Sequence, residues 1–143
     1  MTARRPATVL AGILLAAAAG SVPAATGAIA TEGDAGRGKE IYARCGACHS
    51  LDYDRVGPHH CGLFGRRAGS VEGFEYSKAM KNSKLVWNSE TLDRFIADPL
   101  KTVPGTRMGY AGIPDARERA DLLAYLRASN DGPECSQMSA PRR

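Results

Sequence analysis

The chain has 143 residues, a formal net charge of +4 and 43% hydrophobic residues, which suits one small domain with a single core. Its basic balance does not point to a nucleic-acid partner, because two of the arginines lie in an N-terminal leader. Without them, 17 of the 19 basic residues remain against 15 acidic ones, a net charge of +2, and there is no run of five like charges to act as a nucleic-acid tail.

The first thirty residues have the features of a secretory signal. Two arginines precede an apolar run over residues 9–19, and small residues follow it. This order is typical of a signal peptide, and the run is well short of the ~20 residues that span a bilayer as a helix. We therefore predict a cleaved signal peptide over 1–30, ending at Ala30 or Ala24, and one domain over 31–143. A retained anchor is the alternative, but we expect no stable membrane insertion.

Three segments are predicted to be helical. In the first, Asp34 to Cys48, two glycines, Gly36 and Gly38, suggest close approach of another backbone. The second, residues 88–98, has Ser89 as its predicted N-cap and Leu92, Phe95 and Ile96 on one face. The third covers residues 115–130, with an apolar face of Leu122, Leu123, Tyr125 and Leu126.

No segment alternates convincingly between polar and apolar residues, so an all-α fold is expected. The connections between the helices are rich in Gly and Pro and long for so small a domain. Such loops are uncommon unless something else orders them. We infer that a non-protein group occupies the middle of the domain.

The pentapeptide Cys45-Gly-Ala-Cys48-His49 matches C-x-x-C-H, the pattern of covalent haem attachment. On a helical turn, positions i, i+3 and i+4 share one face, so both sulfurs and the imidazole point at the same object. A structural zinc site using these residues with Cys61 is an alternative, as is a thioredoxin-like thiol pair. The zinc site explains neither the leader nor the long loops, and a thioredoxin-like pair would sit beside a strand in a βαβ pattern, which the sequence does not show.

Iron attached in this way takes a sixth ligand or keeps an open site. The side chains that could supply it are Met80, Met108, Met138, His59, His60 and Cys61. Those at 59–61 follow the attachment motif closely and more easily line the His49 side. Met108 lies in a loop tied to helices on both sides, and a soft thioether suits low-spin iron. Core packing is the alternative role of a lone methionine.

Several segments in one order resemble the class I cytochromes c, in particular the small bacterial members. They run from "GDAGRGKEIYARCGACH" through "VGPHHCGLFGRRAGSVEGFEYSKAM" and "LVWNSETLDRFIADP" to "VPGTRMGYAGI" and "ERADLLAYLRAS". The resemblance covers essentially all of the predicted domain and implies helices and long loops wrapped around one covalent haem c. It implies thioethers at Cys45 and Cys48, with His49 as the proximal ligand and Met108 as the distal one.

The resemblance also assigns supporting roles. The Pro58 carbonyl is implied to accept a hydrogen bond from His49 and so to orient it. Four residues match positions around a buried haem propionate, where hydrogen bonds offset desolvation: Arg66, Tyr76, Trp87 and Thr106. Gly38 with Tyr42, and Leu122 with Tyr125, match the crossing of the terminal helices.

The chain also departs from the family pattern. Phe95 replaces a usual tyrosine near the methionine ligand, and Met80 replaces a common asparagine. His59 and His60 stand where Asn and Leu are frequent; we expect one surface histidine and one partly buried, hydrogen-bonded histidine, with a weak pH sensor as the alternative. The effect of these four residues on the haem is left open.

Cys61 and Cys135 lie outside the attachment motif. In the family fold, the segment that holds Cys61 runs near the end of the C-terminal helix, where "GPECS" places Cys135. The resemblance therefore suggests a disulfide between them, which an exported protein permits. Intermolecular pairing is the alternative.

The function implied by the resemblance is that of a monomeric, periplasmic one-electron carrier and not of an enzyme. Its expected partners are membrane redox complexes, such as a bc1-type complex, an oxidase or a reaction centre. Basic residues around the haem edge would steer docking: Lys39, Arg44, Arg55, Lys78, Lys81, Lys101 and Arg107. The alternatives are a peroxidase-like haem enzyme, which needs an open iron site, and a dedicated electron acceptor of a periplasmic dehydrogenase.

Overall fold

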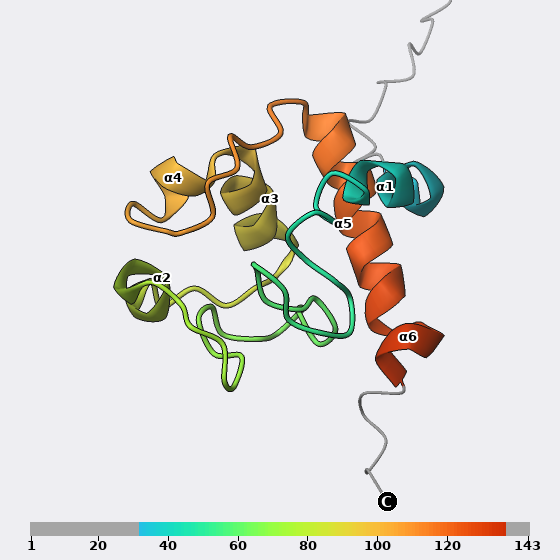
Figure 1. Cartoon of the computed structure of the whole chain (residues 1–143). Helices are drawn as coiled ribbons and strands as arrows, with labels where there is room; N and C mark the ends of the chain where they lie inside the picture. The colour runs from blue at the N-terminus through green and yellow to red at the C-terminus, as the bar shows by residue number, and fades with distance from the viewer. Residues whose placement is uncertain (1–31, 137–143) are drawn as a thin grey trace, which may run out of the picture.

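The computed structural model describes residues 32–136, so the predicted signal peptide and Met138 lie outside the described residues. Within this range the chain forms helices and no strand, apart from one isolated bridge between Arg67 and Val86. The helices are α1 (Ala35–Tyr42), α2 (Lys78–Asn82), α3 (Ser89–Ala97), α4 (Pro99–Thr102), α5 (Ala116–Asn130) and α6 (Pro133–Ser136). The predicted all-α fold is confirmed, and Figure 1 shows long irregular segments between the helices.

The first long helix, α1, lies across α5 (Figure 1). A Cβ atom at Gly38 would lie 2.0 Å from the carbonyl oxygen of Asp121, so only glycine permits this approach of the two backbones. The close approach predicted for Gly38 is therefore confirmed. The same prediction for Gly36 is wrong, because a Cβ there would meet only the side chain of Asp34, at 3.1 Å.

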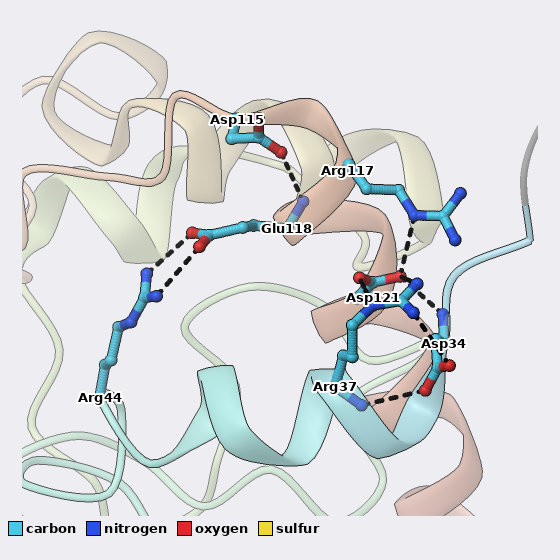
Figure 2. Close-up of polar contacts among 7 residues, drawn as sticks. All are labelled: Asp34, Arg37, Arg44, Asp115, Arg117, Glu118 and Asp121. Atoms are coloured by element: carbon cyan, nitrogen blue, oxygen red, sulfur yellow. Dashed lines mark hydrogen bonds and ion pairs between the residues drawn. The ribbon is translucent and has the colours of Figure 1, made fainter.

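A buried carboxylate fixes this helix crossing (Figure 2). Asp121 is 2% exposed and accepts hydrogen bonds from the backbone N–H of Asp34 at 2.6 Å and from Arg37 Nε at 2.8 Å. Arg117 Nε lies 3.4 Å from the same carboxylate. The hydrogen bond from Arg37, followed by that from Asp34, lowers the pKa of Asp121. These partners offset the cost of burying the charge.

Two predicted helix ends differ from the structure. The first helix ends at Tyr42, and residues 43–48 form turns instead of continuing it to Cys48. The N-cap of α3 is Asn88 and not Ser89: its side chain accepts from the backbone N–H of Thr91 at 2.8 Å, and Thr91 Oγ1 accepts from the Asn88 N–H at 2.9 Å. This reciprocal capping outweighs the preference of Ser89.

The core joins α1, α3 and α5 to the irregular segments. The predicted apolar face of α3, Leu92, Phe95 and Ile96, is buried in it. A second, smaller cluster contains Leu51, Cys61 and Cys135, with Tyr42 and Tyr125 packed against it. No helix among residues 32–136 combines the length and apolar character needed to cross a bilayer.

Candidate functional site

The attachment motif occupies the turn that follows α1. The N–H of Cys45 donates to the Tyr42 carbonyl at 2.8 Å, and the N–H groups of Cys48 and His49 both donate to the Cys45 carbonyl, at 3.0 and 2.9 Å. One helical turn is thus present although α1 has ended, and i, i+3 and i+4 positions on such a turn share one side. Cys45 packs against the main core, and burial raises the pKa of its thiol.

The imidazole of His49 is oriented by its neighbours in the chain. Its Nδ1 lies 2.7 Å from the carbonyl oxygen of Pro58, the contact implied by the family resemblance. Gly57 lies against the ring, since a Cβ there would be 2.3 Å from Cε1. Because a carbonyl only accepts, Nδ1 carries the proton and Nε2 keeps its lone pair. Burial lowers the pKa of His49, which favours the neutral form that binds metals.

The two neighbouring histidines have different surroundings. His60 stacks on His49, with 4.4 Å between ring centroids and 23° between the planes, and its Nδ1 lies 3.1 Å from the Tyr42 hydroxyl. His59 instead contacts Asp54, Nδ1 to Oδ1, at 2.7 Å. Both histidines are partly buried and hydrogen-bonded, so the expectation of one surface histidine is wrong: the side chain of His59 is only 18% exposed. The stacking of His60 on His49 was not predicted.

Arg66 has a role that sequence reasoning missed. Its guanidinium donates to the carbonyl of Cys61 at 2.9 Å and to that of His59 at 2.8 Å. Burial lowers the pKa of Arg66, while the side chain of Tyr76 offsets part of that effect. Arg66 therefore holds the backbone of residues 59–61 and lies in the neighbourhood of Tyr76.

The remaining residues predicted near a propionate belong to one part of the molecule. Trp87 is buried in the main core and packs on Phe95, with ring centroids 5.1 Å apart. Tyr76 packs against the same core. Thr106 Oγ1 accepts a hydrogen bond from the backbone N–H of Met108 at 3.2 Å. The hydroxyl of Thr106 therefore stabilises the loop that contains Met108.

The two methionines considered as axial ligands differ in burial. Met80 is 7% exposed and part of the main core, which gives it a packing role. Met108 is only partly buried and lies against that core in the loop between α4 and α5. A turn precedes it, where Gly105 has φ 90°, a conformation that favours glycine. Of the two methionines, Met108 is therefore the one whose thioether is not buried in the core.

Cys61 and Cys135 lie together and away from the motif cysteines. Their Sγ atoms are 1.92 Å apart and their Cα atoms 5.2 Å apart, the geometry of a disulfide. The alternative zinc site is not assembled, because Cys61 is taken up by this pair and no group of three or more His, Cys, Asp or Glu side chains converges within residues 32–136.

The donor set fits haem c. Cys45 and Cys48 are not joined to each other, and two such thiols on one turn suit two thioether bonds. His49 would hold iron through Nε2, because Pro58 takes Nδ1. Met108 would supply a soft sulfur, which suits haem iron.

Comparisons with known proteins agree with this reading. The family model for cytochrome c matches residues 35–130. Cytochrome c of Euglena viridis is 43% identical over 102 residues, which are 69% of this chain and 100% of that protein. Cytochrome c2 of Blastochloris viridis is 42% identical over 112 residues, 76% of this chain and 88% of that protein. The solved structure of cytochrome cH from Methylobacterium extorquens is 41% identical, with a TM-score of 0.66, covering 67% of this chain and 99% of that one.

Proposed function

The chain belongs to the cytochrome c family, whose cofactor is covalently attached haem c, and on that premise we propose that it is a periplasmic one-electron carrier. The observation that carries the proposal is the imidazole of His49, held by the Pro58 carbonyl at 2.7 Å with Nε2 free to bind iron. Bound haem supplies a reversible one-electron change at iron. If His49 and Met108 both hold the iron, no iron site would remain for a substrate.

The chain's own residues would attach and orient the haem. Cys45 and Cys48 would form the thioethers, and His49 and Met108 would be the axial ligands. The Pro58 carbonyl fixes the tautomer of His49 and raises its basicity, as such partners do for metal-bound histidines. The thioether of Met108 would favour the reduced iron and so raise the reduction potential of the haem.

The propionate environment is proposed to contain Arg66, Tyr76, Trp87 and Thr106. Two N–H groups of Arg66 are used by the carbonyls of residues 59 and 61. A guanidinium has five N–H donors, so others remain for a carboxylate. Thr106 accepts from the Met108 N–H through its oxygen, which leaves its own proton to donate.

The proposed docking surface is less basic than the sequence suggests. Arg44 is engaged by Glu118 through two contacts of 2.8 and 3.0 Å (Figure 2), and Arg55 donates to the Gly46 carbonyl. Arg55 and Arg107 donate to uncharged backbone carbonyls and keep their positive charge. The exposed residues left to steer encounter with acidic surfaces are therefore Lys39, Arg55, Lys78, Lys81, Lys101 and Arg107. The proposed partners are membrane redox complexes of the bc1, oxidase or reaction-centre type. Electron-transfer rates with purified complexes should fall as ionic strength rises.

The axial ligands are tested by comparing two methionines. Met108→Ala should remove the weak ferric band of iron–methionine charge transfer while the haem stays covalently attached. Met80→Leu is the matched control, because a buried methionine tolerates leucine, and it should keep the band. Loss of the band in Met80→Leu with retention in Met108→Ala would reverse the assignment, and peroxide turnover with a high-spin spectrum in the unaltered protein would favour an enzyme.

Export and oxidation are tested on the mature protein. N-terminal sequencing of the periplasmic fraction should begin at residue 31 or 25, as expected for a cleaved signal over 1–30; an intact N-terminus in membranes would favour a retained anchor. We also propose that Cys61 and Cys135 are disulfide-bonded in the exported protein. Their Sγ separation of 1.92 Å supports this pairing. Intact mass without reductant should show no free thiol.

A further inference from the structure

The three residues 59–61 are held by bonds to separate parts of the molecule. The N–H of Cys61 donates to the carbonyl of Leu51 at 2.7 Å. Arg66 grips the carbonyls at both ends of the segment, at 2.8 and 2.9 Å. The sulfur of Cys61 lies at bonding distance from that of Cys135 in α6. The middle residue of this segment, His60, therefore starts from a backbone with little freedom.

The side chain of His60 is held as well. Its Nδ1 is linked to the Tyr42 hydroxyl at 3.1 Å, and the Tyr42 ring lies edge-on to it at 5.6 Å between centroids. The ring of Tyr42 in turn packs on Tyr125 of α5, with centroids 5.2 Å apart. The imidazole of His60 is thus connected to the crossing of α1 and α5. One face of its ring lies on the His49 ring, with 4.4 Å between the centroids.

One hydrogen bond is not enough to fix an imidazole. Hydrogen bonds tolerate a range of angles, so the bond from His49 Nδ1 to the Pro58 carbonyl leaves the ring some rotation about its Cβ–Cγ bond. A flat surface against the ring face removes this rotation. His60 provides such a surface, with its plane 23° from that of His49, and Gly57 allows the ring to sit close to the backbone.

We propose that His60 is a positioning residue for the proximal ligand, and that its ring, held by Tyr42 and the 59–61 segment, sets the plane of the His49 imidazole. The inference rests on the proposed function, in which His49 binds the haem iron. A leucine in this place fills volume but has neither a flat face nor a hydrogen bond that fixes its rotamer. Burial lowers the pKa of His60 well below its usual value, so the stacked ring is neutral near pH 7.

The test uses the full chain, purified with haem attached. His60→Leu removes the stacked ring, and Tyr42→Phe keeps both rings but removes the hydroxyl that holds His60. His59→Leu is the matched control, because His59 is the adjacent residue of the same type and contacts Asp54 instead. The readouts are the ferric electron paramagnetic resonance g values and the haem methyl proton shifts, which depend on the plane of the axial imidazole. The midpoint potential is measured on the same samples.

His60→Leu is expected to shift the g values and to change the spread of the methyl shifts. Tyr42→Phe is expected to shift them in the same direction by less, and His59→Leu to leave them unchanged. A purely structural role would lower the melting temperature of His60→Leu and leave the spectra alone, and that result overturns the proposal. If His60→Leu does not accumulate, unchanged spectra in Tyr42→Phe overturn it.

The same spectra separate this inference from the proposed function. An unaltered protein with the iron–methionine band, together with unchanged spectra in the His60 variant, overturns the positioning role alone. An unaltered protein that attaches no haem overturns the proposed function and the positioning role with it.

Discussion

The pair Cys61 and Cys135 gives the prediction with the largest expected effect on stability. The proposed disulfide would close a loop of 74 residues, and constraining a loop of that length in the unfolded chain contributes about 4 kcal/mol in the chain-entropy model. Engineered and native examples often deliver less, so we expect Cys61→Ala/Cys135→Ala to lower the free energy of unfolding by about 2 to 4 kcal/mol. Alanine is the replacement because the two side chains are 6% and 4% exposed, where serine would bury a hydroxyl.

The assay is equilibrium unfolding in guanidinium chloride, followed by the fluorescence of Trp87, the only tryptophan in the chain. The haem is kept ferrous in all samples so that reductant changes only the disulfide. Adding a disulfide reductant should destabilise the unaltered protein toward the double variant. The double variant itself should be insensitive to reductant, which makes it the matched control.

Two results would refute this reasoning. One is a double variant within about 0.5 kcal/mol of the unaltered protein, a difference typical of surface substitutions without a specific role. The other is labelling of both cysteines in the unfolded, unreduced protein by a thiol reagent. Either result would mean that the tail beyond α5 is held by packing alone.

Three further predictions concern the helix crossing and the haem surroundings. Gly38→Ala should lower the free energy of unfolding by about 2 to 3 kcal/mol, because the added methyl group overpacks against the Asp121 carbonyl. Gly36→Ala, two residues away, should instead raise it by about 0.5 kcal/mol through helix propensity. Chemical denaturation of both variants tests this, and equal effects would contradict it. Because Arg37 lowers the pKa of Asp121, this carboxylate stabilises the fold above about pH 4 and the contribution is lost as pH falls through the folded pKa. Asp121→Asn should therefore be less stable at neutral pH and have a flatter acid limb, and parallel curves of unfolding free energy against pH would refute the assignment. Phe95→Tyr adds a hydroxyl expected to hydrogen-bond near the Met108 sulfur. A bond of about 1 kcal/mol corresponds to a shift of about 40 mV in the midpoint potential of a one-electron couple. An unchanged midpoint potential in a redox titration would show that residue 95 does not influence the iron.

Local patterns predicted the parts of the fold that local physics determines. The buried face of α3 follows from the spacing of Leu92, Phe95 and Ile96. The close contact at Gly38 follows because only a residue without a Cβ atom lets two backbones approach so closely. The end of α1 at Tyr42 was missed, although Gly46 and two cysteines make residues 43–48 a poor helix.

The site shows the same division. The contact between His49 and the Pro58 carbonyl was predicted because the short loop that joins them resembles the same loop of the cytochrome c family. The stacking of His60 on His49 was not, because it depends on where two separate loop positions and Tyr42 meet in space. The available signal was the replacement of an apolar residue by histidine directly beside the attachment loop. The bonds from Arg66 to two backbone carbonyls were missed for a related reason, because contacts with backbone carbonyls leave no trace in the sequence.

The smaller cluster of Leu51, Cys61 and Cys135 connects the short C-terminal helix α6 to the candidate haem site. Four residues of helix, as in α6, are far below the length at which a helix is stable alone, so α6 depends on Cys135 and its contacts in this cluster. The same cluster includes Cys61, one residue from the ring that stacks on His49, and it is covered by Tyr42, which holds that ring. The C-terminal end of the fold and the placement of His49 therefore share one small group of contacts, which Tyr42 joins to the main core around Trp87 and Phe95.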